Sequence, residues 1–277
     1  MADNSKLKTQ NSKLIVSRDN SLLRRAREVR DGTARESIYV EGLRLCEEAL
    51  RSNLNLEAVI YSEQIARKDR AANLIHELES VSAKSASVSE KLLESISYTK
   101  TPQGIIVLAA RPQLTETQFK TAQPHDPLLV ILHGINNPVN LGAILRTAEA
   151  AGATGVIATE GTSDPYSPKS LRGAMGAAFR LPIWTNAAFP QVIDWCRTHR
   201  IKTASAVAKA ARSYVDLDWR TPTALVMGPE SAGLSGAEVA ATDESVHIPM
   251  QGSTESLNVA VAAGILLYEA HRQRSAA

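Results

Sequence analysis

The residues best suited to chemistry fall in three segments, each of which follows a short apolar run. The first, residues 133–152, begins with the turn-forming letters HGINNPVN and continues into a helix-like pattern that contains Arg146. We predict a helix over residues 141–151 that begins near Asn140, with Gly152 as its stop. Arg146 then lies within the first two turns, close to the end of the preceding strand. A loop followed by a solvated surface arginine is an equally good interpretation of this segment taken alone.

The second segment joins an apolar run to a glycine and a carboxylate. Residues 224–235 read ALVMGPESAGLS, so Gly228 ends the run, Glu230 follows it, and Gly233 precedes a predicted helix. Glycine allows a backbone to approach a ligand closely. The spacing excludes the G-x-G-x-x-G fingerprint of dinucleotide-binding folds, and the Gly-Lys-Ser/Thr of a phosphate-binding loop is missing. A simple turn with a capping glutamate is the alternative.

The third segment places polar residues in front of an apolar helix. Residues 246–258 read VHIPMQGSTESLN, and residues 259–268 form the longest apolar run of the chain. We predict a helix over residues 256–271, with Ser256 at its N-cap and Asn258 supporting the cap. This helix is apolar on nearly all sides, so we expect it to be deeply buried. Capping alone also explains both side chains, and it is compatible with a functional role.

These three segments belong to a domain that alternates strands and helices. The strand expected over residues 128–133 is apolar throughout, which is typical of a parallel strand buried on both faces. Further strands follow with helices between most of them, which indicates a doubly wound parallel sheet. Ligands bind such sheets at the carboxyl ends of the strands, where all three polar segments stand. The further strands are expected at residues 155–159, 181–184, 201–206, 223–227 and 245–248.

The first part of the chain predicts a separate, small α/β domain over residues 14–110. Residues 1–13 are polar, and we expect them to be disordered. Residues 111–127 contain three prolines and few large apolar residues, so we interpret them as a linker to a second domain over residues 128–277. In the first domain, strands are expected at residues 37–41, 56–61 and 104–109, and helices at residues 19–30 with Asp19 as cap, 42–51, 69–79 and 90–95.

Charge and composition restrict the classes of partner. The net charge of the 277 residues is only +2, so contacts with nucleic acid must be local. Nine basic residues against four acidic ones in the first 35 positions provide such a local excess. Cys46 and Cys196 are far apart in the sequence, which disfavours a disulfide framework and a zinc site. No secretory signal and no apolar run long enough to span a bilayer is visible, so we expect a cytoplasmic protein without a membrane segment.

Together, the three polar segments resemble the three sequence motifs of the SpoU (SPOUT, TrmH-like) family of RNA 2′-O-ribose methyltransferases. Their order, their spacing and the apolar terminal helix all match this family. The first segment resembles the family's motif that begins with an asparagine and ends in R-T-A, and Asn140 and Arg146 carry this resemblance. The second resembles its G-x-E-x-x-G-L block through Gly228, Glu230 and Gly233, and the third its I-P-M…S-L-N-V block through Ile248, Ser256, Leu257 and Asn258.

The resemblance implies a trefoil-knotted α/β fold for the C-terminal domain and S-adenosylmethionine as the methyl donor. It implies that Arg146 places the RNA phosphate and stabilises charge on the 2′-oxygen, that Asn140 positions Arg146 or the ribose, and that Glu230 orients Arg146 or another cation. Because an ordinary arginine is not a simple base, a phosphate and a perturbed Arg146 both remain open as proton acceptor. Ser256 and Asn258 are expected near the donor and the acceptor hydroxyl, and Ala206, Gly228, Ile248 and Leu257 are expected to hold the donor.

The resemblance extends to the N-terminal domain. Residues 39–44, 92–97 and 101–106 resemble the family's substrate-binding domain, which is similar to small RNA-binding ribosomal proteins. Members with this domain tend to act on ribosomal RNA, so rRNA is the expected partner and tRNA the alternative. A homodimer is also implied, and the apolar terminal helix suits packing against a second copy. The sequence departs from the family at His133, where an acidic residue is common, at Asn136-Asn137, where an Asp-containing pair is more usual, and at Gly173, where a serine is expected.

Two other classes of function compete with this interpretation. A non-catalytic RNA-binding protein of the same fold is disfavoured because Arg146 and Asn258 are both present. A nucleotide-dependent enzyme such as a dehydrogenase is disfavoured because the glycine fingerprint is missing. We expect no metal, because methyl transfer from an activated sulfonium does not require one and no cluster of metal ligands is visible.

Overall fold

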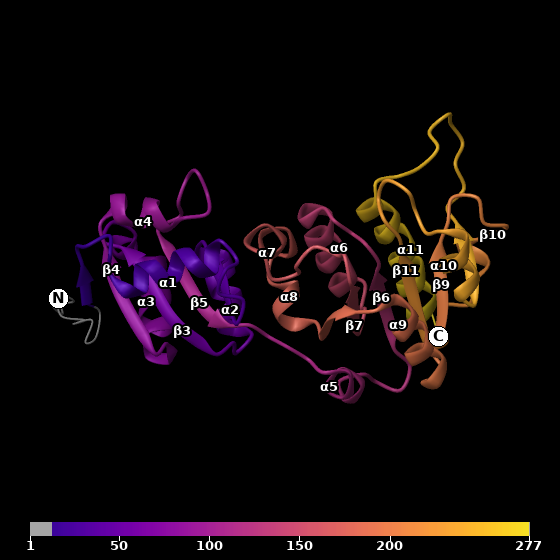
Figure 1. Ribbon diagram of the computed structural model, residues 1–277, viewed down its shortest axis with the longest axis horizontal. Helices are drawn as coiled ribbons and strands as arrows, with labels where there is room; N and C mark the ends of the chain where they lie inside the picture. The colour runs from indigo at the N-terminus through magenta and orange to yellow at the C-terminus, as the bar shows by residue number, and fades with distance from the viewer. Residues whose placement is uncertain (1–12, 277) are drawn as a thin grey trace. The chain divides into compact units, whose positions relative to one another are not determined.

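The computed structural model describes residues 13–276 of the chain. Contacts within the chain divide it into two compact units (Figure 1). The first extends to Pro112 and also takes in Tyr166–Pro168, and the second comprises the rest of the chain from Gln113 on. The disorder predicted for residues 1–13 concerns residues outside the described part, except for Lys13, which begins the first strand. Each unit has a sheet of its own, as the alternation of strands and helices predicted.

A mixed sheet of five strands forms the centre of the N-terminal unit. Its strand order is β1-β4-β3-β5-β2, and β5 runs antiparallel to both of its neighbours. The pairs β1–β4 and β3–β4 are parallel, so β1, β2, β3 and β4 all end at one edge of the sheet, where β5 begins. The strands are β1 (Lys13–Ile15), β2 (Ser37–Glu41), β3 (Leu56–Ser62), β4 (Lys84–Val88) and β5 (Ile105–Ala110).

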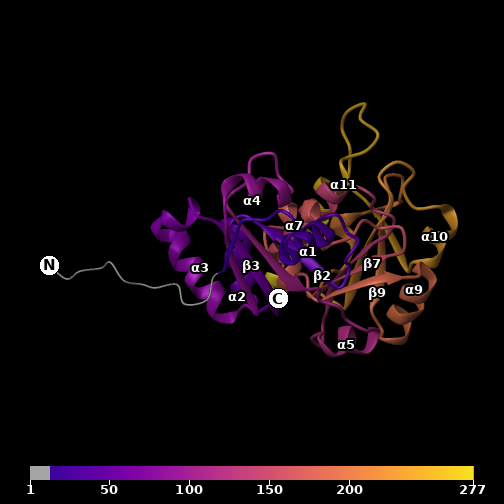
Figure 2. The same cartoon turned by 60° about the vertical axis from the view of Figure 1, so that its left-hand side comes forward.

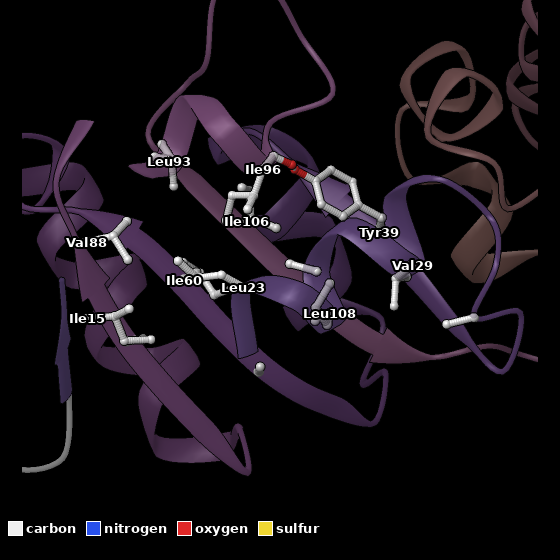
Figure 3. Close-up of a cluster of buried hydrophobic side chains, with 14 residues drawn as sticks. Ile15, Leu23, Val29, Tyr39, Ile60, Val88, Leu93, Ile96, Ile106 and Leu108 are labelled. Atoms are coloured by element: carbon white, nitrogen blue, oxygen red, sulfur yellow. The ribbon is translucent and has the colours of Figure 1, made fainter. Parts of the chain in front are cut away.

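Aliphatic side chains make the core of this unit, with Tyr39 as its aromatic member (Figure 3). The first helix of the unit presents Leu23 to this core. Its cap is Asn20 and not the predicted Asp19, because the Asn20 Oδ1 accepts the backbone N–H of Leu22 at 2.9 Å. The helices are α1 (Ser21–Arg30), α2 (Leu43–Arg51), α3 (Asp69–Val81) and α4 (Glu90–Ile96), with a 3-10 turn η1 (Ile65–Arg67).

Two strands of this sheet, β1 and β4, are absent from the prediction. The sequence of β4 is KSASV, in which Ala86 and Val88 are the only apolar residues, so its alternation is too short and too weak to predict a strand. Its five residues pair with β3 over their whole length. The strand therefore owes its conformation to its neighbour in the sheet and not to a local pattern.

The segment predicted as a linker contains a helix, α5 (Glu116–Thr121). Thr115 and Gln118 form a capping box at its start, in which each side chain bonds to the backbone of the other residue. Phe119 is fully buried, and its ring centroid lies 6.0 Å from that of Trp184 and 5.7 Å from that of Trp195. Most of the predicted linker therefore belongs to the second unit, held there by one buried aromatic ring.

A parallel sheet of seven strands forms the centre of the second unit, as predicted. Every neighbouring pair is parallel. β6, β7 and β11 are buried along their whole length, which explains their continuous apolar runs. The strands are β6 (Leu128–Leu132), β7 (Gly155–Thr159), β8 (Ile183–Ala187), β9 (Lys202–Ala206), β10 (Arg212–Ser213), β11 (Thr223–Met227) and β12 (Glu244–His247).

The strand order of this sheet, β10-β12-β9-β11-β6-β7-β8, contains a switch point. From β8 at one edge the chain crosses to β9 and continues to β10 at the other edge. It then returns to place β11 between β9 and β6, and crosses again to place β12 between β10 and β9. The carboxyl ends of β6, β11, β9 and β12 therefore stand side by side, which is where open α/β sheets bind ligands. The trefoil knot implied by the family resemblance stays a prediction.

Two helices of this unit begin at positions that differ from the prediction. α6 (Pro138–Ala150) starts with a proline and is capped by Asn137, so Asn140 lies inside its first turn. α11 (Val259–Ser275) begins three residues after Ser256, and its N-cap is Asn258, whose side chain accepts the first free N–H groups of the helix. The other helices are α7 (Pro168–Ala174), α8 (Ala177–Arg180), α9 (Phe189–Thr198) and α10 (Gly236–Ala241), with a 3-10 turn η2 (Tyr214–Asp216).

The last helix is less buried than its apolar sequence predicts. Leu266 and Leu267 are buried on one side, whereas Val261 and Tyr268 are each 52% exposed on the other. The prediction of a deeply buried helix is therefore wrong for the single chain. α11 packs mainly on α6, which covers only one side of α11. Within residues 13–276, no helix combines the length and the apolar character needed to cross a bilayer.

Candidate active site

Four neighbouring strands bring the three motifs to one edge of the C-terminal sheet. Leu132 at the end of β6 pairs with Met227 at the end of β11, and the backbone N–H of His133 donates to the Met227 carbonyl at 2.9 Å. Ala206 at the end of β9 pairs with Val246 in β12. The three polar segments therefore start from adjacent strand ends.

The first and third motifs meet through two asparagines that are 118 residues apart in the sequence. The Asn258 Nδ2 donates to the Asn140 Oδ1 at 3.3 Å. The Asn258 Oδ1 accepts the backbone N–H groups of Ala260 at 2.9 Å and Val261 at 3.4 Å. One side chain thus caps α11 and ties its start to the first turn of α6.

Arg146 lies on α6 but on a different face from Asn140. Six residues correspond to about 600° of helical rotation, so the two side chains leave the helix roughly 120° apart. Arg146 is exposed, as is Val139, seven residues before it on the same side of the helix. Within the described part of the chain, the Arg146 guanidinium has no hydrogen-bond or ion-pair partner, and so it is bonded to neither Asn140 nor Glu230. It is therefore available to an anion from outside the chain.

The second motif forms a tight turn at the end of β11. A Cβ on Gly228 would lie 2.7 Å from the Cγ and 2.8 Å from the backbone N of Leu234, so no larger residue fits there. Gly233 has a φ of +66°, and its N–H donates to the Pro229 carbonyl at 2.9 Å. Glu230 is exposed on this turn and forms no ion pair with any of residues 13–276.

The residues predicted to hold the methyl donor lie along the same edge. Ala206 ends β9, Gly228 follows β11 and Ile248 follows β12, while the half-buried Leu257 immediately precedes the cap of α11. Residues 248–257 make no hydrogen bond to another described residue, and both views show this loop standing away from the sheet (Figure 1, Figure 2). Free backbone groups beside a glycine that admits no side chain fit a nucleoside-like ligand such as S-adenosylmethionine.

A polar network behind this edge has no counterpart in the sequence prediction. The Nδ1 of His133 lies 2.9 Å from the Thr159 Oγ1, and its Nε2 lies 3.0 Å from the Glu238 Oε1. The imidazole also packs on Phe189, with ring centroids 4.5 Å apart. The backbone N–H of Ser235 donates to the Glu238 Oε2 at 2.7 Å and, with the bond from His133, holds the pKa of that carboxyl below its usual range. The network anchors α10, the helix that follows the second motif, to the ends of β6 and β7. The only sequence signal for it was the histidine at a position where the family commonly has an acid.

Comparison with known proteins identifies the family. The SpoU rRNA methylase family matches residues 127–268. The chain belongs to this family. A further match, to the MRM3-like substrate binding domain, covers residues 21–107. The resemblance drawn from the three motifs, and the methyltransferase class that it implied, are therefore confirmed.

Individual SpoU relatives extend over both units. An uncharacterized tRNA/rRNA methyltransferase of Synechocystis is 32% identical over 267 residues, which cover 95% of this chain and 95% of that protein. The 23S rRNA (guanosine(2553)-2′-O)-methyltransferase RlmP of Bacillus subtilis is 29% identical over 239 residues, 86% of this chain and 90% of the relative. The crystal structure of an AdoMet-bound rRNA methyltransferase from Sinorhizobium meliloti is 27% identical, with a TM-score of 0.83 over 94% of this chain and 98% of that one. The α/β architecture of both units is thus that of known SpoU structures.

One departure from the SpoU pattern has a steric explanation. Gly173 on α7 stands where a serine is expected. A Cβ on Gly173 would lie 3.1 Å from the Gly142 Cα, and a Cβ on Gly142 would lie 2.5 Å from the Ser170 carbonyl oxygen. The backbones of α6 and α7 are therefore in direct contact, and a side chain at either glycine would move the helix that carries Asn140 and Arg146.

Proposed function

We propose that this SpoU protein is an S-adenosylmethionine-dependent methyltransferase that modifies the 2′-hydroxyl of a ribose in 23S rRNA. The observation that carries the proposal is the Asn258–Asn140 hydrogen bond of 3.3 Å, because it joins two of the family's motifs beside the third. The match of residues 21–107 to a substrate-binding domain supports an RNA substrate. The name of the Bacillus subtilis relative supports 23S rRNA as that RNA.

The methyl donor would be held at the edge formed by the ends of β9, β11 and β12. Ala206, Gly228, Ile248 and Leu257 would hold it, mainly through backbone groups. When bound, S-adenosylmethionine supplies a methyl group that its sulfonium already activates, so the protein has to orient the donor and activate the acceptor. Among residues 13–276, no group of three or more His, Cys, Asp or Glu side chains is placed to hold a metal ion.

Arg146 is the residue that we assign to the acceptor ribose. Its exposed guanidinium, which has no partner among residues 13–276, can bind an RNA phosphate and stabilise negative charge on the attacking 2′-oxygen. The bonded amides of Asn140 and Asn258 would position the ribose, with Ser256 on the exposed loop beside them. Glu230 forms no ion pair with a described residue, so a cation that it orients would come from outside the single chain.

The exposed side of α11 favours a homodimer. Val261 and Tyr268 are seven residues apart, so they lie on the same side of the helix, and each is 52% exposed. Val139 on the neighbouring helix α6 is 48% exposed. Apolar side chains left open on two packed helices suit contact with a second copy. In sedimentation at micromolar concentration we expect a dimer that Tyr268→Asp shifts toward monomer, whereas a monomeric parent protein would contradict the proposal.

The cytoplasm is the compartment that fits the cysteines. Cys46 and Cys196 are free and buried. Burial raises the pKa of the Cys196 thiol to about 12, so it stays protonated and unreactive. Free thiols of this kind suit a reducing compartment.

Transfer of a labelled methyl group tests the proposed reaction. The protein is incubated with labelled S-adenosylmethionine and either unmodified 23S rRNA or bulk tRNA, and the product is digested with alkali. A 2′-O-methyl group blocks alkaline cleavage, so we expect labelled, alkali-resistant dinucleotides from 23S rRNA. Label in tRNA alone would contradict the substrate. The absence of label in every RNA, with donor binding intact, would favour the non-catalytic alternative.

A further inference from the structure

The segment between α4 and β5 is fixed by side chains from α1 and β2. The Tyr39 hydroxyl donates to the Ile96 carbonyl at 2.8 Å, and Figure 3 shows the tyrosine oxygen directed at that residue. The Arg30 Nη1 lies 3.3 Å from the carbonyl oxygens of both Ser95 and Ser97. The start of the segment is therefore bound to the core of the unit through its backbone.

Glu41 fixes the next residues of this segment. Glu41 is only 7% exposed, and its carboxylate accepts three hydrogen bonds, from the Tyr98 N–H at 2.9 Å, the Thr99 N–H at 3.3 Å and the Thr99 hydroxyl at 2.7 Å. A carboxylate so deeply buried is tolerated because it is hydrogen-bonded. At the far end of the segment, a Cβ on Gly42 would lie 2.5 Å from the Gln103 Oε1. The segment is thus held in place by side chains of its own unit.

An aromatic ring and a cation are what this fixed segment presents to solvent. The Tyr98 side chain is 43% exposed, although aromatic residues make up only 4% of the chain. Lys100, two residues later, is exposed and has no ion-pair partner in the described part of the chain. Exposed aromatic rings beside cations are the side chains on which unpaired RNA bases stack.

A groove of 390 Å³ lies beside α4, the helix that precedes this segment. Ser95 lines it, and apolar side chains such as Leu92 form part of its wall. Arg18, after β1, and Lys91, after β4, line the groove together with one acidic residue, Glu63. Both cations are exposed, and neither forms an ion pair with a residue of the range 13–276. The groove therefore offers cations to a phosphate backbone, and its lining residue Ser95 stands three positions before Tyr98 in the chain.

The basic residues of α1, by contrast, are largely engaged within the chain. Arg25 pairs with Glu36 at 2.6 Å, and Arg30 pairs with Asp31 at 2.8 Å in addition to bracing the segment described above. The Arg27 Nη2 donates to the Arg18 carbonyl at 2.9 Å. The local excess of basic residues near the N-terminus therefore does not mark α1 itself as the phosphate-binding surface.

We propose that Tyr98, Lys100, Arg18 and Lys91 form a subsite for a single-stranded stretch of the RNA substrate, with one unpaired base stacked on Tyr98. This rests on the proposed function, since it assigns part of the RNA site of a methyltransferase. Stacking accepts any base, so Tyr98 fixes where the strand lies and not which sequence it has. The cations of the groove hold the phosphates that follow.

Substitution of Tyr98 in the full-length protein tests the subsite. Affinity is measured with a mixed-sequence, single-stranded oligoribonucleotide and with an unmodified 23S rRNA fragment. Loss of one stacked base corresponds to roughly a 5- to 150-fold weakening, which we expect for Tyr98→Ala, whereas Tyr98→Phe keeps the ring and the affinity. Arg18→Ala and Lys91→Ala should each reduce the slope of log affinity against log salt by about one. Val81→Ala changes an exposed apolar side chain at the end of α3, before the start of β4, and serves as the control that should change nothing.

Glu41→Gln tests whether the fixed conformation matters. We expect it to weaken RNA binding when Tyr98 is present and to add little to Tyr98→Ala, because both changes act on the same stacked base. Unchanged affinity of a folded Tyr98→Ala protein for both RNAs would overturn the subsite. If that variant still methylates 23S rRNA, the proposed function stands without the subsite. If the unaltered protein methylates no RNA, the proposed function fails, while the oligoribonucleotide result still decides the subsite.

Discussion

The loops at the strand ends of the two sheets, one in each unit, are held in opposite ways. At the N-terminal edge, Tyr39, Arg30 and Glu41 satisfy the backbone of the segment before β5. At the C-terminal edge, residues 248–257 make no hydrogen bond to another described residue. The first loop therefore has its shape before any ligand arrives, whereas the second leaves its backbone groups for a ligand to satisfy. The difference separates the proposed RNA surface, which the chain itself holds in place, from the proposed site for the donor and the acceptor, which they would complete.

Arg146→Ala gives the largest expected effect at the C-terminal edge. We expect single-turnover methylation to fall by roughly two to three orders of magnitude, because charge on the 2′-oxygen loses its partner in the transition state. Donor affinity should hardly change, since Arg146 forms no hydrogen bond with any of the predicted donor residues. Arg146→Lys should rescue poorly, because a point charge does not reproduce the planar guanidinium. Measuring rate and donor affinity separately checks this, and full activity in folded Arg146→Ala would exclude the mechanism.

Removal of residues 1–112 deletes the preformed edge while keeping α5 and its buried Phe119 with the second unit. We expect the remaining domain to fold and to bind S-adenosylmethionine. Its affinity for 23S rRNA should fall at least about tenfold, with a shallower dependence on salt, because phosphate contacts are lost. Donor calorimetry and RNA titration at two salt concentrations measure both effects. RNA affinity equal to that of the full chain would contradict the division of labour between the two edges.

Asn258→Ala should affect stability, donor affinity and rate together. The change removes the cap of α11, which corresponds to roughly 0.5–2 kcal/mol, and the link to Asn140. Asn258→Asp is the matched control, because its carboxylate still caps the helix but has no N–H to donate to Asn140. We expect the Asp variant to regain stability against urea without regaining donor affinity. Equal donor affinity in the Ala variant and the parent protein would separate Asn258 from the site.

Glu238→Gln should have the smallest effect and a characteristic pH dependence. Bonds from Ser235 and His133 hold the pKa of the Glu238 carboxyl below its usual value of 4.5. A carboxylate with a lowered pKa in the folded state adds stability that is fully present above the usual pKa and is lost as the pH falls through the folded-state value. The variant should therefore lose about 1 kcal/mol at pH 7, and the difference should shrink below pH 4.5.

Urea unfolding at pH 7 and at pH 4 or below measures this difference. The control is Glu255→Gln, on the loop of residues 248–257, whose carboxylate has no hydrogen-bond partner among the described residues. It should leave stability unchanged at both pH values. A difference for Glu238→Gln that stays constant across this range would show that its ionisation does not contribute.

Local patterns explain which parts of the fold and site could be predicted. The strand Thr223–Met227 is a continuous apolar run that ends in a glycine, and it lies where the sequence placed it. Ser256 and Asn258 are equally plausible caps in the sequence, because both side chains can accept a backbone N–H. The choice of Asn258 follows from its second bond, to a residue 118 positions away. The helix around Phe119 escaped prediction because its short sequence gains its stability from two tryptophans of the folded unit.

The sequence by itself determined the order of the elements, the motifs at the strand ends and the family, because periodicity and turn residues act over a few neighbouring positions. Only the tertiary structure decided that the Glu41 carboxylate holds Tyr98 and Thr99, or that His133 reaches Glu238 across 105 residues. Contacts of this kind depend on which strands become neighbours in the sheet. That order is settled by burial and hydrogen bonding over the whole domain, and no short stretch of sequence contains it.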